Sequence, residues 1–240
     1  MIIRKVALKE LGDLRMKFLA AIDNQFTYDK CHLFGWADTW LFTTDRSVAG
    51  YGAVWGKDKR EERDSIMEFY LEEEYRKDAH EIFAKFIEAT NTSYIECQSN
   101  DPFLSEMLFE FATGIYAEAI LFEEDFTSSI VIEGAGLVSD KSDNKFDRPY
   151  VLKHKNVIVG KGGLLLNYNF PYADIYYGIE EEHRRKGYGS FFVQELKKVA
   201  YNIGRVPAAR TNIDNTISKR TMMKAGLKPC GWRLGGKITK

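Results

Sequence analysis

Hydrophobic and polar positions follow two periods along this chain, one of two residues and one of about 3.6 residues. Helical spacing of apolar residues predicts helices from Asp13 to Ile22, over 79–89 and after Pro102. Runs rich in β-branched and aromatic residues predict strands at residues 2–8, 40–44, 47–55, 65–71, 93–97 and 115–122. The pair Asp45-Arg46 is typical of a turn between two of these strands. Strands and helices in alternation predict an α/β or α+β layer architecture.

A polar stretch from Ser139 to Lys145 interrupts this pattern. It suits either a linker between domains or a long hairpin loop, and the sequence favours neither.

Beyond the polar stretch the same periods predict strands at 150–155, 157–167, 174–179 and 208–212 and helices at 190–203 and 216–224. Gly226 is suited to ending the last of these helices.

The two halves of the chain contain an ungapped internal repeat. Residues 71–83 (LEEEYRKDAHEIF) align with residues 179–191 (IEEEHRRKGYGSF), so that three glutamates, one arginine and the closing phenylalanine coincide. The segment AGYG (49–52) precedes one copy as VGKG (159–162) precedes the other, and a helix, a strand and a second helix follow each copy. We therefore predict two similar domains that have diverged, over residues 1–126 and 127–240.

Composition narrows the classes of function. The chain has 34 Lys and Arg against 35 Asp and Glu, a balance that argues against a nucleic-acid-binding protein. No apolar run approaches the ~20 residues that span a bilayer, and charge follows the N-terminus too closely for a signal peptide. Cys31, Cys97 and Cys230 are widely spaced and suggest neither a disulfide framework nor a metal site. We expect a cytoplasmic monomer or homodimer with no metal, nucleic-acid or membrane partner.

The most specific chemical signal is the run RRKGYGS at residues 184–190, between a predicted strand and a predicted helix. Unpaired N–H groups and the helix dipole bind anions at such a position. Gly187 and Gly189 allow a ligand to approach the backbone, and three consecutive cations suit a pyrophosphate. The alternative is a solvated basic turn, but the strand–loop–helix context favours a phosphate site.

Here the chain resembles the GNAT superfamily of N-acetyltransferases, whose acetyl-CoA motif is Arg/Gln-x-x-Gly-x-Gly/Ala. Asn215 and Ser218, followed by Ala225-Gly226-Leu227, also resemble the family's next segment. The resemblance implies a mixed, mostly antiparallel twisted sheet flanked by helices in each domain. It also implies that strand 174–179 splays from its neighbour to pair with the pantetheine arm. The residues that it assigns to acetyl-CoA are Ile179, Arg184, Arg185, Lys186, Gly187, Tyr188, Gly189, Ser190, Asn215 and Ser218.

The first copy departs from this motif. Ala79 and Glu81 stand where the second copy has Gly187 and Gly189. A side chain would intrude there, and a carboxylate would repel a pyrophosphate. We therefore predict that residues 1–126 form a degenerate domain without a phosphate loop, and that residues 127–240 form the acetyl-CoA-binding catalytic domain.

The usual proton-transfer positions of the family also differ. Met222 stands where many members have a tyrosine acid, and Arg210 where some have a glutamate base. Asp174, Tyr176, Tyr177 and His183 remain as candidates for moving the amine proton, although each also has a structural explanation. Of these, we predict Asp174 and Tyr177 as catalytic residues. Arg210 is a candidate for binding a carboxylate of the acceptor, although surface arginines are common.

The resemblance therefore implies an acetyltransferase that uses acetyl-CoA as its cosubstrate. We expect direct transfer, in a ternary complex, to a primary amine of a small molecule or peptide. The altered proton-transfer positions leave an alternative open. In that alternative the protein is a weak or inactive acyl-CoA-binding sensor or interaction module.

Overall fold

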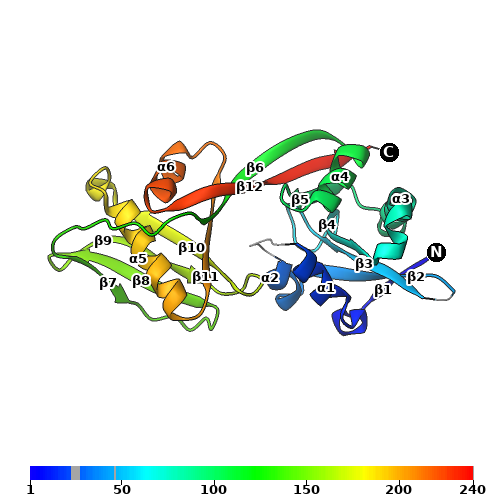
Figure 1. The fold of residues 1–240 in the computed structure, drawn as a ribbon, viewed down its shortest axis with the longest axis horizontal. Coiled ribbons are helices and arrows are strands. Elements are labelled where there is room, and N and C mark those ends of the chain that lie inside the picture. Colours follow the sequence, from blue (N-terminus) through cyan, green and yellow to red (C-terminus); the bar gives the residue numbers. More distant parts are fainter. Residues whose placement is uncertain (23–27, 46, 240) are drawn as a thin grey trace. The chain divides into compact units, whose positions relative to one another are not determined.

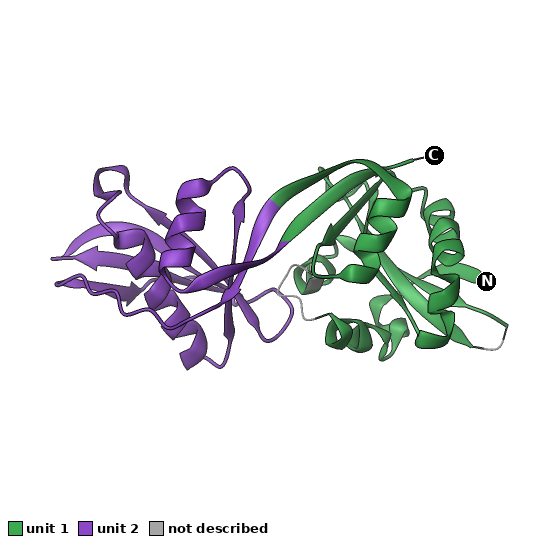
Figure 2. Cartoon of the chain, turned by 45° about the horizontal axis from the view of Figure 1, so that its top comes forward, with its two compact units in different colours: residues 1–24, 28–118, 232–240 green, residues 25–27, 119–231 purple. Residues whose placement is uncertain are grey.

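The computed structural model describes residues 1–22, 28–45 and 47–239, and the expected turn residue Arg46 lies outside them (Figure 1). The described residues form two compact units (Figure 2). Unit 2 contains Ala119–Gly231, and unit 1 contains the described residues before Ala119 and those from Trp232 onward. Residue 126 lies within unit 2.

Unit 1 is a mixed sheet with helices on both faces. Its elements are β1 (Ile2–Val6), η1 (Leu8–Leu11), α1 (Leu14–Ala21), α2 (Tyr28–Leu33), β2 (Ala37–Thr43), β3 (Val48–Trp55), β4 (Ser65–Leu71), η2 (Glu73–Asp78), α3 (Ala79–Thr90), β5 (Tyr94–Gln98) and α4 (Pro102–Phe111). The strand order is β1-β2-β3-β4-β5, antiparallel except between β4 and β5. The helix predicted over 79–89 from its apolar spacing is confirmed, because Ile82, Phe83 and Phe86 are buried in the core under α3.

Unit 2 repeats the strand order of unit 1 and its last two helices, but among its described residues no helix lies between the first two strands. Its elements are β7 (Ala135–Ser139), β8 (Asp147–His154), β9 (Val157–Leu165), β10 (Tyr172–Ile179), η3 (Glu181–His183), α5 (Tyr188–Asn202), β11 (Val206–Asn212) and α6 (Thr216–Lys224). The sheet is antiparallel except between β10 and β11. Because β7 and β8 pair directly, the polar stretch at 139–145 is a hairpin loop and not a linker. The predicted fold class is confirmed in both units.

Strands β6 (Ala112–Glu124) and β12 (Leu227–Ile238) belong to both units. β6 follows α4 of unit 1, and its residues 119–122 pair with β11 in unit 2. β12 follows α6 of unit 2, and its residues 233–237 pair with β5 in unit 1. Figure 2 shows the change of unit along both strands. Each sheet is thus extended by a strand that begins in the other unit. The sequence analysis did not predict β7, β12 or α2.

The internal repeat has the same structural position in both units. Leu71 ends β4 opposite Gly50 of β3, and Ile179 ends β10 opposite Gly160 of β9. A Cβ atom on Gly160 would lie 2.6 Å from the carbonyl oxygen of Gly178, and one on Gly50 would overlap a carbonyl of β4. Glycine at these positions lets the two strands approach each other just before the turn into the helix.

Candidate functional site

Strand β10 separates from β11 halfway along its length, as the sequence analysis expected. It pairs with β11 from Tyr172 to Ile175 only, whereas its pairing with β9 continues to Ile179. The N–H of Glu180 donates to the carbonyl of Val159 at 3.0 Å. Because backbone groups alternate in direction along an antiparallel strand, those of Tyr177 and Ile179 point away from β9. The backbone groups of Tyr177 and Ile179 therefore face the side on which β11 no longer pairs with β10.

The loop after β10 ends in a helix start with free N–H groups. Gly187 is the N-cap of α5 with φ +86°, a left-handed conformation that favours glycine. The first N–H of the helix with a backbone acceptor is that of Phe191, which donates to Gly187 at 3.2 Å. Within the described chain, the N–H groups of Tyr188, Gly189 and Ser190 have no acceptor. This arrangement can bind an anion.

The loop's polar side chains mostly contact the protein itself. The hydroxyl of Tyr188 shares a hydrogen bond of 2.9 Å with Nδ1 of His154, and that of Ser190 donates to the carbonyl of Thr221 at 3.2 Å. The ammonium of Lys186 donates to the carbonyl of Glu182 at 2.9 Å. In these three residues the backbone is therefore more available to an anion than the side chain is.

Helices α5 and α6 and strand β10 meet beside this loop. A Cβ atom on Gly189 would lie 3.0 Å from Cγ2 of Thr221 and 3.5 Å from the ring of Tyr177. The Tyr177 hydroxyl shares a hydrogen bond of 3.1 Å with that of Ser218 on α6. Burial raises the pKa of Tyr177, and the hydrogen bonds of Ser218 and Thr221 oppose this only in part. Tyr177 therefore stays a protonated phenol that can donate at neutral pH.

Asn215 has a clear structural role at the start of α6. Its side-chain oxygen accepts the N–H of Ser218 at 3.0 Å and caps the helix. Met222, at the position of the family's tyrosine acid, is 2% exposed and packs in the core of unit 2. His183 packs edge-on against the ring of Tyr188. The contacts of these three side chains are those of a helix cap, a core residue and a loop residue.

Asp174 and Tyr177 lie on opposite faces of β10, because residues an odd number apart on a strand point in opposite directions. Asp174 is 4% exposed, and its carboxylate lies 3.9 Å from Nε of Arg210. Arg210 also donates to the hydroxyl of Tyr168 at 2.8 Å. Tyr176 donates to the carboxylate of Asp147 at 2.8 Å. The structure thus brings Asp174 and Arg210 together and keeps both apart from Tyr177.

At the corresponding place in unit 1, aromatic and aliphatic side chains pack together. Phe69 occupies the position of Tyr177 in the repeat and stacks on Phe103 of α4, with ring centroids 5.3 Å apart. Leu104, at the position of Ser218, is fully buried. Glu81 forms an ion pair with Lys85 at 2.6 Å at the start of α3. Packing and charge therefore both disfavour a coenzyme in unit 1.

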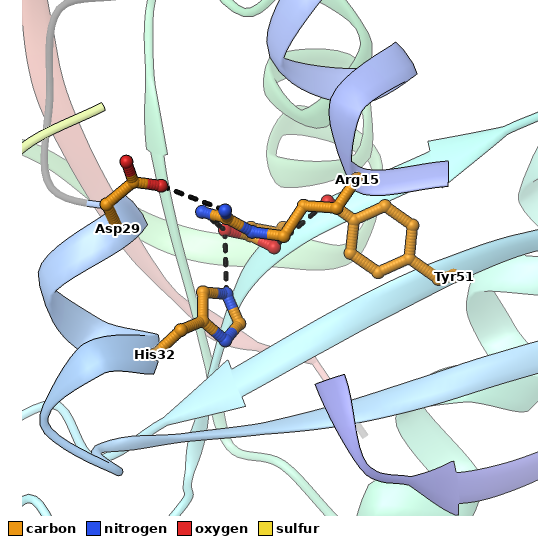
Figure 3. Close-up of polar contacts among 5 residues, drawn as sticks. Arg15, Asp29, His32 and Tyr51 are labelled. Atoms are coloured by element: carbon orange, nitrogen blue, oxygen red, sulfur yellow. Dashed lines mark hydrogen bonds and ion pairs between the residues drawn. The ribbon is translucent and has the colours of Figure 1, made fainter. Parts of the chain in front are cut away.

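A second polar cluster lies in unit 1, on the face of β4 opposite Phe69 (Figure 3). The carboxylate of Glu68 is fully buried and accepts from Tyr51 at 3.0 Å. It lies 3.0 Å from Nε2 of His32 and 3.4 Å from a guanidinium nitrogen of Arg15, which also pairs with Asp29 at 2.8 Å. Sequence reasoning missed this cluster; its only signal was one charged residue within the apolar run SIMEFYL.

Among the described residues, no group of three or more His, Cys, Asp or Glu side chains could hold a metal ion. None of the described helices is long and apolar enough to cross a membrane.

Comparison with known proteins finds similarity over nearly the whole chain. A model described as an acetyltransferase (GNAT) domain matches residues 7–125, and a model of the acetyltransferase (GNAT) family matches residues 116–227. No curated protein sequence matches the chain.

Solved structures of low identity share the fold. An acetyltransferase from the GNAT family from Colwellia psychrerythraea has a TM-score of 0.82 at 13% identity, with 100% of both chains covered. A tandem GNAT protein from the clavulanic acid biosynthesis pathway has a TM-score of 0.65 at 13% identity, covering 100% of this chain and 99% of that one. A GCN5-related N-acetyltransferase from Sphaerobacter thermophilus has a TM-score of 0.61 at 12% identity, covering 100% and 96%.

Proposed function

Because the chain belongs to the GNAT superfamily and carries two of its acetyltransferase domains in tandem, we propose that unit 2 transfers acetyl from acetyl-CoA to a primary amine. The observation that carries this proposal is the set of three free N–H groups at Tyr188, Gly189 and Ser190, beside the splayed end of β10. Unit 1 lacks both glycines at the same position, and there Phe69 stacks on Phe103.

The residues present fit coenzyme A on two counts. The free N–H groups and the positive end of α5 suit a pyrophosphate. The outward backbone groups of Tyr177 and Ile179 suit the amides of a pantetheine arm and can polarise a thioester carbonyl. Arg185 has φ +61° and adds a positive charge in the loop.

Transfer requires two proton movements. The amine nitrogen forms a bond to the acetyl carbon while the C–S bond breaks; the amine loses a proton and the sulfur gains one. The Tyr177 hydroxyl, held by Ser218 in the groove, is the proposed donor to the sulfur. Asp174 is the proposed proton acceptor on the opposite face of β10. Opposite faces suit direct transfer in a ternary complex, since the acceptor then approaches from the side away from the coenzyme.

Arg210 lies beside Asp174 on the face proposed for the acceptor. Its side chain is partly exposed, and its guanidinium contacts both Asp174 and Tyr168. We propose that the exposed part of this group binds a carboxylate of the acceptor, in the way that arginine commonly binds carboxylates.

The first test is thermal unfolding with and without acetyl-CoA. At ~100 times its dissociation constant the coenzyme adds about 2.7 kcal/mol of stability, or roughly 5–10 °C for a chain of this size. Gly189→Glu copies the residue of unit 1 and abolishes the shift, whereas the matched control Glu81→Gly in unit 1 keeps it. No shift in folded wild-type protein would refute the proposal.

Binding without transfer is the second candidate function, favoured by Met222 and Arg210 at the family's usual acid and base positions. Release of free thiol from acetyl-CoA in the presence of a panel of amines separates the two functions. Amine-dependent release supports the acetyltransferase. A thermal shift with no release across small amines and peptides supports an acyl-CoA sensor.

A further inference from the structure

Helices α4 and α6 correspond residue by residue, because the same capping contact begins both. The Asp101 side chain accepts the N–H of Leu104 at 3.1 Å, and the Asn215 side chain accepts the N–H of Ser218 at 3.0 Å. Counting from these caps, the fifth residue along is Glu106 in unit 1 and Arg220 in unit 2.

In unit 1 this position reaches the start of the neighbouring helix. A surface hollow of about 380 Å³ is lined by residues 76–81 together with Phe103 and Glu106 of α4. Nε2 of His80 lies 3.2 Å from the carboxylate of Glu106. His80 aligns with Tyr188 of the anion-binding loop. By this correspondence, a side chain at the position of Arg220 can reach the start of α5, which is proposed to bind the pyrophosphate.

Three negative charges of unit 1 are lost at these equivalent positions of unit 2, and two of them are replaced by positive charges. Asp78, Glu81 and Glu106 of unit 1 correspond to Lys186, Gly189 and Arg220 of unit 2. α6 carries Lys219, Arg220 and Lys224 and no acidic residue, whereas α4 carries two glutamates and no cation. In the part of unit 2 that the structure describes, Arg220 is exposed and forms no ion pair.

We propose that Arg220 binds the 3′-phosphate of coenzyme A and makes unit 2 selective for the 3′-phosphorylated coenzyme; this rests on the proposed function. Coenzyme A carries a pyrophosphate and, on its ribose, a separate phosphate. The N–H groups of the loop suit the pyrophosphate. The 3′-phosphate on the ribose therefore needs another cation, outside this loop. A guanidinium binds phosphate through paired hydrogen bonds, which an exposed arginine without a partner can supply. Ile217, at the position of Phe103 and 75% exposed, offers an apolar contact beside it.

The test compares the dissociation constants of coenzyme A and 3′-dephospho-coenzyme A by calorimetry. Wild type is expected to bind coenzyme A about tenfold more tightly, which corresponds to ~1.4 kcal/mol. In Arg220→Glu this preference disappears, while the affinity for the dephospho compound stays close to that of wild type. Unchanged melting of Arg220→Glu without ligand shows that the variant is folded, as expected for an exposed side chain.

Lys224→Glu is the matched control, because it makes the same charge change at another unpaired cation on α6. This variant is expected to keep the preference. An unchanged preference in Arg220→Glu, or an equal loss in both variants, would overturn the assignment. If wild type binds neither compound, the proposed function itself fails. If wild type binds both compounds tightly and equally, only the role of Arg220 is refuted and the proposed function is unaffected.

Discussion

Nε of Arg184 donates a hydrogen bond to the carbonyl oxygen of Ile179 at 3.1 Å, closing the turn between β10 and α5. In unit 1 the aligned arginine, Arg76, makes the same contact with Leu71 at 3.5 Å. Unit 1 keeps this contact although it has lost both glycines of the loop. The motif arginine therefore has a structural role that does not depend on a coenzyme: it fixes the path of the chain from strand to helix.

Replacing either arginine tests this role. Arg184→Met and Arg76→Met are each expected to lower the free energy of unfolding by about 1 kcal/mol, the usual contribution of one hydrogen bond. Only Arg184→Met should also weaken acetyl-CoA binding, because the loop that it orders lies in unit 2. Urea unfolding and calorimetry measure the two effects. If Arg184→Met weakens binding without any loss of stability, the arginine is a direct phosphate ligand instead.

Tyr177→Phe removes the proposed proton donor and keeps its ring. We expect kcat to fall by about 10²- to 10⁴-fold with little change in KM for acetyl-CoA. Ser218→Ala removes the hydrogen-bond partner of the Tyr177 hydroxyl, found at 3.1 Å, and should have a smaller effect on kcat. Steady-state kinetics at saturating amine distinguish the two variants. Equal rates in Tyr177→Phe and wild type would exclude Tyr177 as the donor.

Glu68 is the buried charge on which the polar cluster of unit 1 depends. Glu68→Gln leaves Arg15 and His32 without their carboxylate partner and is expected to cost about 3–5 kcal/mol. Burial acts to raise the pKa of Glu68, but His32 and Arg15 outweigh it, so that the pKa is lowered. Its stabilising contribution is therefore present above the ordinary pKa of about 4.3 and is lost as the pH falls through the lowered value.

Unfolding measured between pH 7 and pH 3 tests this account of Glu68. Wild type should lose more stability over that range than Glu68→Gln. Parallel curves would show that the carboxylate of Glu68 is not the group that titrates.

Asp101 has the opposite pH dependence. Burial raises the pKa of Asp101 to about 6, although backbone N–H groups at the start of α4 oppose the shift. A raised pKa contributes stability that is present below the ordinary value of about 3.9 and is lost as the pH rises through 6. Asp101→Asn keeps a capping oxygen for Leu104 and should be more stable than wild type at pH 8, by about 1–2 kcal/mol. Thermal melts of wild type and Asp101→Asn at pH 5 and pH 8 compare their stabilities. A variant that is more stable than wild type at pH 5 but not at pH 8 would contradict the raised pKa of Asp101.

Much of the candidate site could be predicted from the sequence, because its geometry is local. A glycine with positive φ at Gly187 and free N–H groups in the first turn of a helix follow from a few consecutive residues. The register that places Gly50 opposite Leu71 and Gly160 opposite Ile179 follows the internal repeat. The odd spacing of Asp174 and Tyr177 already implied opposite faces of one strand.

The sequence by itself thus determined the repeat, the helix starts and the loss of the glycine loop in the first copy, since these depend on backbone geometry over neighbouring residues. The tertiary structure alone decided which strands pair and which side chains meet. The exchange of β6 and β12, the stacking of Phe69 on Phe103 and the burial of Glu68 among Arg15, His32 and Tyr51 join residues far apart in the chain. Such contacts depend on how side chains pack and form hydrogen bonds throughout the folded unit. The local spacing of hydrophobic positions does not predict them.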